Sequence, residues 1–232
     1  RISAGTPGAL EWPRVIVITI PQKEAVGCAC MFISLDGVDG VGKSTQLALL
    51  VDWLRERPVP VESCRDPGST ELGEAIRQIV LHGGATPIDR ISEMLLYMAA
   101  RAQLVRQIIR PALAAGKVVV CDRYLLANVV YQGYAGGLDV EQLWSVGEVA
   151  TGGLHPDLTV VLDMDVQAAG ARLERSRDRM ESQGDGFLQR VRQGFLTESR
   201  LRHEHIVVVD AARDRERVQQ DIRTAVARLL KE

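Results

Sequence analysis

From position 31 onward, short apolar runs alternate along the chain with segments in which apolar residues recur three or four positions apart. The runs predict five β-strands, over 31–35, 59–64, 118–121, 158–162 and 206–209. The periodic segments predict one helix that follows the first strand and ends at Pro58, and others over 72–79, 89–115, 139–151, 166–179, 186–204 and 214–230. We expect Pro111 to kink or shorten the longest of them. Strands that alternate with helices are typical of an α/β fold with a parallel sheet.

The first 30 residues do not follow this pattern. They contain Pro7, Pro13 and Pro21 and end directly before the first strand, so we expect 1–30 to be an extension outside a domain formed by 31–232. The β-branched run over 15–20 leaves a second possibility, an added edge strand. This run is too short to span a membrane and lacks the basic flank of a signal peptide.

Composition narrows the classes of function. A hydrophobic content of 46% over 232 residues supports a sizeable core. The net charge of −2 argues against binding to nucleic acid or to an anionic membrane, so an anionic ligand should meet a local arginine cluster. The cysteines, Cys28, Cys30, Cys64 and Cys121, form no pairs with zinc spacing. We therefore expect reduced thiols and a cytoplasmic protein.

The segment after the first strand has the pattern G-x-x-x-x-G-K-[ST]. It reads Gly37, Val38, Asp39, Gly40, Val41, Gly42, Lys43, Ser44 and Thr45. Its glycines let successive backbone N–H groups curl around a phosphate at the start of the next helix, which predicts an ATP site. We expect Lys43 to face the ligand rather than the core and to reach the β- and γ-phosphates, and the Ser44 hydroxyl to bind Mg²⁺. A glycine turn without a ligand is the alternative.

Polar residues also follow the second and third strands, and the carboxyl ends of parallel strands are where α/β proteins bind ligands. The segment 65–70 reads Arg-Asp-Pro-Gly-Ser-Thr, and Asp122-Arg123-Tyr124 follows the third strand. Asp122 is placed to hold the water shell of Mg²⁺, and Arg123 can bind a phosphate through two nitrogens. A surface ion pair between the two is the alternative.

Together these motifs resemble those of bacterial thymidylate kinases, in order and over the whole of 31–232. The matching segments are Asp36–Thr45, Arg65–Thr70, Ala100–Gln103, Asp122–Tyr124, Tyr131–Gly133 and Pro156–Leu158. The resemblance implies a P-loop NTPase, a three-layer α/β/α sandwich around a five-stranded parallel sheet, with a short lid over about 172–186. It also implies direct, in-line transfer of the γ-phosphoryl group of ATP to dTMP, giving dTDP and ADP, with Mg²⁺ and in a homodimer.

The resemblance assigns roles in the acceptor site. An acid in the phosphate loop of the family contacts the sugar and phosphate of dTMP, and this position is Asp39. Thymine stacks on an aromatic residue four positions before an arginine that binds the base, which matches Tyr97 and Arg101 on one helix face. Arg123 matches the arginine that binds the acceptor phosphate. The other dTMP-binding residues implied are Arg65, Asn128, Tyr131 and Gln132.

Three positions depart from the usual family residues: Tyr97 stands in place of phenylalanine, Ala127 of serine and Asp66 of glutamate. From the residues alone, Tyr97 and Arg101 could instead be a core tyrosine beside a surface arginine.

A cluster of arginines lies in the segment that corresponds to the lid. Its members are Arg172, Arg175, Arg177 and Arg179. Such a run can be a solvated helix face, but a lid arginine can stabilise the phosphoryl group during transfer and help to exclude water. Thymidylate kinases place a catalytic arginine either in the phosphate loop or in the lid. The loop here contains none, so the resemblance implies that the lid supplies it, Arg177 first and then Arg175 or Arg179. Lys43, Asp39 and Arg123 complete the predicted catalytic set.

Two other functions remain possible on the residues alone. One is a related kinase that acts on dUMP, CMP or a deoxynucleoside. The other is a nucleotide-dependent switch, although the chain lacks the Asn-Lys-x-Asp motif that reads guanine.

Overall fold

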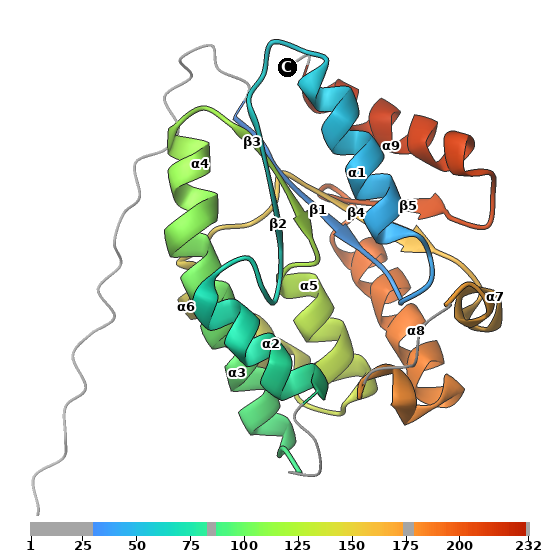
Figure 1. The fold of residues 1–232 in the computed structure, drawn as a ribbon. Helices are drawn as coiled ribbons and strands as arrows, with labels where there is room; N and C mark the ends of the chain where they lie inside the picture. The colour runs from blue at the N-terminus through green and yellow to red at the C-terminus, as the bar shows by residue number, and fades with distance from the viewer. Residues whose placement is uncertain (1–29, 83–86, 174–178, 231–232) are drawn as a thin grey trace, which may run out of the picture.

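The computed structural model describes residues 30–82, 87–173 and 179–230. At its centre is a five-stranded sheet in the order β2-β3-β1-β4-β5, in which every neighbouring pair is parallel (Figure 1). The strands are β1 (Phe32–Asp36), β2 (Val61–Arg65), β3 (Val118–Asp122), β4 (Leu158–Asp163) and β5 (Ile206–Asp210). The predicted α/β fold with five parallel strands is confirmed.

Helices cover both faces of the sheet. On one face lie α1 (Lys43–Arg55) and α9 (Arg215–Leu229), packed against each other (Figure 1). The opposite face carries α3 (Arg90–Leu104), η1 (Val105–Ile109), α4 (Arg110–Ala114), α5 (Leu125–Asn128), η2 (Val129–Ala135), α6 (Val140–Thr151) and α8 (Asp185–Leu201). The remaining elements, α2 (Glu71–His82), α7 (Val166–Ala171) and η3 (Glu181–Gln183), lie toward the carboxyl ends of the strands.

Several element boundaries differ from the prediction. The long helix expected over 89–115 is α3, a π-helical turn η1 and α4, and Pro111 is accommodated at the start of α4, where a missing N–H costs little. Strand β2 begins at Val61 rather than at position 59, since Pro60 has no N–H to give to the sheet. The helix expected over 166–179 ends at Ala171, and residues 174–178 lie outside the described part of the chain.

The sequence pattern missed α5 and η2 entirely. Every residue from Leu125 to Gly133 is buried, so this segment has no polar face from which a helical period could be recognised. The omission matters because these two helices face the carboxyl ends of β1 and β3. None of the described helices is long and apolar enough to cross a membrane.

Candidate active site

The phosphate loop connects the buried strand β1 to the N-terminus of α1. Gly40 has a φ of +87°, and a Cβ there would collide with the backbone carbonyl of Ala169. Gly42 has a φ of +96°, and a Cβ on it would meet no atom within 4 Å. The loop therefore needs glycine for its backbone and leaves open space in front of the first turn of α1, where the helix dipole favours an anion.

The Lys43 side chain folds back over this loop. Its Nζ donates to the carbonyl oxygens of Gly37 and Val38, at 3.0 and 2.9 Å, and to Oδ1 of Asp39, at 3.1 Å. Only 6% of Lys43 is exposed, although the residue also lines the hollow beside the loop, where a ligand would lie. Its exposure is low because three oxygen atoms of the loop itself satisfy the ammonium group. Burial and the nearby Arg123 lower the pKa of Lys43, and Asp39 opposes them.

Asp39 joins Lys43 to Arg123, which follows β3. Its Oδ1 accepts from Arg123 Nη2 at 2.6 Å, and its Oδ2 accepts from the Tyr131 hydroxyl at 3.5 Å. Burial acts to raise the pKa of Asp39, but Arg123 and Lys43 outweigh it and hold that pKa well below its usual range. Asp39 is thus ionised and holds two cationic side chains, Lys43 and Arg123, in place at the phosphate loop.

Arg123 occupies an unusual backbone conformation, with a φ of +66°. Its N–H donates to the Leu35 carbonyl at 2.9 Å, and its Nη1 donates to the Gly37 carbonyl at 3.0 Å. A left-handed conformation in a residue with a side chain costs about 1–3 kcal/mol and is concentrated at functional sites. Here it accompanies a guanidinium that is held against the phosphate loop.

A hollow beside the loop, called here the phosphate pocket, is lined by Asp39, Gly40, Gly42, Lys43, Ser44, Thr45, Arg65, Arg77, Asp122, Arg123, Arg172 and Leu173. Both predicted metal ligands, Ser44 and Asp122, belong to it. Oδ1 of Asp122 is buried and has no hydrogen-bond partner among the described residues. An unpartnered carboxylate oxygen beside a hydroxyl fits a hard cation such as Mg²⁺.

A second hollow, called here the acceptor cavity, lies between the phosphate loop, α2, α3 and the α5–η2 helices. Seven of its lining residues were predicted, namely Asp39, Tyr97, Arg101, Arg123, Asn128, Tyr131 and Gln132. The remaining lining residues are Asp66, Pro67, Arg77, Leu81, Ala127 and Met180. Tyr97 and Arg101 do reach the same cavity from one face of α3.

Arg101 is a buried residue, only 2% exposed, so the alternative of a surface arginine is wrong. Its Nε donates to Oδ2 of Asp66 at 2.6 Å, and its Nη1 donates to Oδ1 of Asn128 at 2.9 Å. Burial raises the pKa of Asp66, against the effect of Arg101. This ion pair fixes the guanidinium at the wall of the cavity.

Comparison with known proteins identifies the family to which this site belongs. The thymidylate kinase family model matches residues 35–222. The chain belongs to the thymidylate kinase family. The thymidylate kinase of Symbiobacterium thermophilum is 47% identical over 201 residues, which make up 86% of this chain and 94% of the relative. That of Clavibacter michiganensis subsp. michiganensis is 47% identical over 203 residues, 86% of this chain and 96% of the relative.

A solved structure agrees with these relatives. The crystal structure of thymidylate kinase from Ehrlichia chaffeensis superposes with a TM-score of 0.72 at 28% identity, and covers 85% of this chain and 98% of that one. The chain is therefore an ATP-dependent nucleoside monophosphate kinase that phosphorylates dTMP. The relatives give no support to a nucleotide-dependent switch or to a different acceptor.

Two arginines of this thymidylate kinase lie where the sequence did not predict them. Arg65, expected at dTMP, lines the phosphate pocket but not the acceptor cavity, and its Nη2 lies 3.0 Å from Oε1 of Glu74. Arg77, which the sequence analysis did not single out, lines both hollows. Its position on α2 between the buried residues Ile76 and Val80 could have indicated a functional role, because charged side chains are uncommon beside buried positions.

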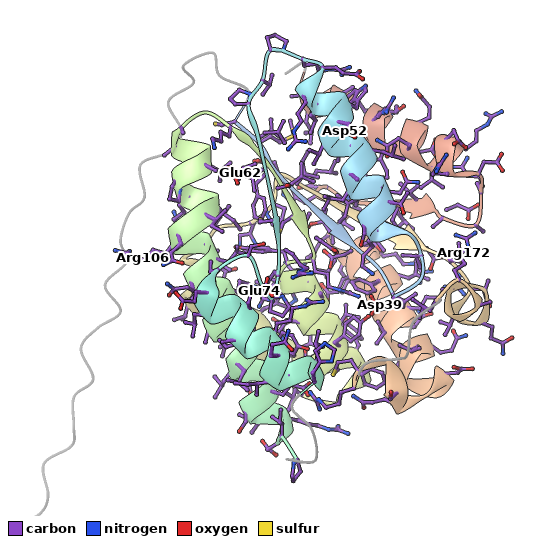
Figure 2. All side chains as sticks on the ribbon, viewed as in Figure 1. Asp39, Asp52, Glu62, Glu74, Arg106 and Arg172 are labelled. Atoms are coloured by element: carbon purple, nitrogen blue, oxygen red, sulfur yellow. The ribbon has the colours of Figure 1, made fainter. Side chains whose placement is uncertain are left out.

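Only part of the predicted lid can be placed. Arg175 and Arg177 lie outside the described residues. Arg179 donates through Nε to the Val80 carbonyl at 2.7 Å, and its Nη2 pairs with Glu93. Arg172 lines the phosphate pocket, and Figure 2 shows it on the same side of the molecule as Asp39. Of the lid arginines that the structure describes, only Arg172 therefore reaches the phosphate pocket.

Proposed function

We propose that the acceptor cavity holds dTMP, with its base toward Arg101 and its phosphate toward Arg123, while the phosphate pocket holds the phosphates of ATP. One observation carries this proposal: Asp39, Arg77 and Arg123 line both hollows. An acceptor phosphate in one hollow and a donor phosphate in the other would meet at these three residues. Such a shared wall is what direct transfer between two bound nucleotides requires.

The chain's own residues then act by positioning and by neutralising charge. A phosphoryl group in transfer is loosely bonded, so little covalent chemistry is left to the protein. Lys43 would exchange its carbonyl partners for phosphate oxygens of ATP. Arg123, tied to Asp39 and Gly37, would hold the attacking oxygen in line. Asp39 would keep both cations in place rather than take part in bond making.

Mg²⁺ fits the residues at the phosphate pocket. Asp122 and Ser44 would hold the ion, Asp122 through its buried, unpartnered Oδ1. Bound there, Mg²⁺ would neutralise charge on the transferring phosphate. Among the described residues, no group of three or more His, Cys, Asp or Glu side chains is arranged to hold a metal ion by itself, so water and phosphate oxygens would complete the coordination.

The nucleoside of ATP would lie in an adjoining groove. This groove runs from Gly42 and Thr45 past Arg172 to the segment after β5, which includes Ala211 and Arg213. It shares Gly40, Gly42 and Thr45 with the phosphate pocket, so a nucleotide bound across the two would span them without a gap.

We also propose a cytoplasmic homodimer. Two pairs of large apolar side chains are exposed on α2 and α3, which pack against each other. They are Leu72 and Ile79, each 47% exposed, and Ile91 and Leu95, 56% and 50% exposed. Exposed apolar side chains on two helices that pack together suit contact with a second copy of the chain. Light scattering of the parent and of Leu95→Asp should give a dimer and a monomer, respectively.

The central experiment is a coupled assay of ADP release with saturating ATP and a panel of acceptors. The panel contains dTMP, dUMP, dCMP and thymidine. We expect dTMP to have the highest kcat/KM and thymidine, which lacks the phosphate proposed to bind Arg123, to have the lowest. If the chain phosphorylates thymidine with the same kcat/KM as dTMP, this result would contradict the proposed place of the acceptor phosphate.

A further inference from the structure

A continuous chain of buried hydrogen bonds runs along the wall of the acceptor cavity. Arg101 Nη1 donates to Oδ1 of Asn128 at 2.9 Å, and Nδ2 of Asn128 donates to Oε1 of Gln132 at 2.7 Å. Nε2 of Gln132 then donates to Oε1 of Glu93 at 2.8 Å. The other carboxylate oxygen of Glu93 pairs with Arg179, and Glu93 itself is only 6% exposed.

The two ends of this chain decide which way its amides point. A guanidinium can only donate and an ionised carboxylate can only accept, whereas an amide can do both. Since Arg101 donates at one end and Glu93 accepts at the other, the amides of Asn128 and Gln132 must each turn their oxygen toward Arg101 and their nitrogen toward Glu93. A reversed amide would place two donors or two acceptors against each other in a buried site.

This polarity has a consequence for the cavity. The carbonyl oxygen of Gln132 has two lone pairs, and Asn128 uses one of them. Gln132 also lines the acceptor cavity, so the second lone pair can receive a hydrogen bond from a ligand there. An acceptor at this point matches a pyrimidine whose ring nitrogen carries a hydrogen, as in thymine and uracil, and opposes cytosine, whose ring nitrogen is itself an acceptor.

We propose that Glu93 is a positioning residue for base specificity. It does not touch the substrate but holds the Gln132 amide so that an acceptor faces the base. A carboxylate suits this role because its two oxygens serve two donors at once, Gln132 on one and Arg179 on the other. The inference rests on the proposed placement of the dTMP base in the acceptor cavity.

The test compares kcat/KM for dTMP, dCMP and dUMP in Glu93→Gln. A glutamine at 93 has one oxygen for two donors, so its amide nitrogen must oppose either Arg179 or Gln132. We expect the ratio of dTMP to dCMP to fall about tenfold or more, because a misoriented or unpartnered amide no longer rejects cytosine. The ratio of dTMP to dUMP should stay within about twofold of the parent value, because the two bases present the same ring N–H.

A rescue separates this role from a general loss of structure. In Glu93→Gln/Arg179→Met the single oxygen at 93 is free to accept from Gln132, so the ratio of dTMP to dCMP should return to within about threefold of the parent. In Glu93→Met/Arg179→Met no acceptor remains, and the ratio should stay low. Arg179→Met alone should leave the ratio unchanged. Any effect of Arg179→Met on turnover applies to dTMP and dCMP alike, so it cancels in the ratio of their kcat/KM values.

Gln132→Ala distinguishes failure of this inference from failure of the proposed site. If it leaves the ratio of dTMP to dCMP unchanged, Gln132 does not contact the base and the placement of dTMP is wrong. If Gln132→Ala lowers the ratio of dTMP to dCMP but Glu93→Gln leaves it at the parent value, the proposed base site is supported and the proposed role of Glu93 is overturned. Failure of the Arg179→Met rescue would also overturn it.

Discussion

Near the phosphate loop, three charged side chains hold one another in fixed positions. Asp39 binds Lys43 and Arg123 at once, and the loop carbonyls supply the remaining acceptors. The free site therefore already has the shape in which its cations face one region of space. Such preorganisation reduces the rearrangement needed when charge develops during transfer.

The first prediction concerns Lys43→Ala. We expect kcat to fall by about three orders of magnitude or more, because the ammonium that would neutralise the donor phosphates is lost. The fold should persist, since α1 and β1 keep their apolar contacts. Lys117→Ala is the matched control, because Lys117 forms only a half-exposed ion pair with Glu62. A Lys43→Ala enzyme with turnover within tenfold of the parent would disprove the assignment.

The second prediction concerns Arg101→Ala. We expect a higher KM for dTMP with little change in the KM for ATP, since only one substrate loses a contact. The change also leaves the buried Asp66 without its partner, which should cost about 3–5 kcal/mol in the free energy of unfolding. Arg106→Ala serves as a control, because Arg106 is exposed on the neighbouring helical turn and lies across the molecule from Asp39 (Figure 2). Equal losses toward both substrates would indicate a purely structural residue.

The third prediction concerns Asp36, which is fully buried in β1 directly before the loop. Burial raises its pKa from 3.8 to about 7, against the effects of Arg123 and Lys43. Between these two values the folded chain keeps a proton that the unfolded chain has released, so the contribution of Asp36 to stability is lost as the pH rises.

An asparagine at this position does not titrate. Asp36→Asn should therefore stabilise the chain more at pH 8 than at pH 5, relative to the parent. Urea unfolding at the two pH values, without nucleotide or metal, measures the difference. An equal effect at both would mean that Asp36 stays ionised in the folded chain.

Among helices and loops, success in prediction followed the strength of the local pattern. The phosphate loop, β1 and α1 were recognised because glycine positions and apolar periodicity act over a few residues. The α5–η2 segment was missed because it is buried on all sides and so has no period. Its residues Asn128, Tyr131 and Gln132 were found only through the family resemblance.

The fourth prediction concerns the lid. Alanine at Arg175, Arg177 and Arg179, made singly, should include at least one variant in which kcat falls about tenfold or more, with kcat/KM falling in parallel. We expect the largest loss at Arg177. Arg179 is held by Val80 and Glu93, so its loss should affect kcat less. If all three retain the parental kcat, Arg123 or Arg65 becomes the candidate for the catalytic arginine.

For the molecule as a whole, the order of the strands determines what a sequence can reveal about the site. The sheet order β2-β3-β1-β4-β5 places the residues after β1, β2 and β3 at one edge, as expected for parallel strands. The places of the residues that α2 and α3 contribute, such as Arg77 and Glu93, depend on how α2 packs against α3 and how α3 packs against α5. No local pattern encodes that packing, so their roles emerged only from the structure.

The fifth prediction concerns the extension. A chain that starts at Met31 should have the melting temperature and turnover of the full chain, because the family match begins at residue 35 and Met31 already joins the sheet through its carbonyl. Thermal unfolding and the coupled assay compare the two chains side by side. A large drop in either quantity would show that residues 1–30 contribute a strand or a part of the site.

The central position of β1 in the sheet also affects how the protein folds during its synthesis on the ribosome. Ser34 of β1 contacts Thr159 of β4, 125 residues later in the chain. At a synthesis speed of about 5–20 residues per second, β1 is made roughly 6 to 25 seconds before that neighbour exists. Of the five described strands, the one that carries the phosphate loop is thus made first, but it gains its second neighbour only when β4 exists. During this interval its apolar residues lack their partner strand, so they must be kept from associating with other nascent chains.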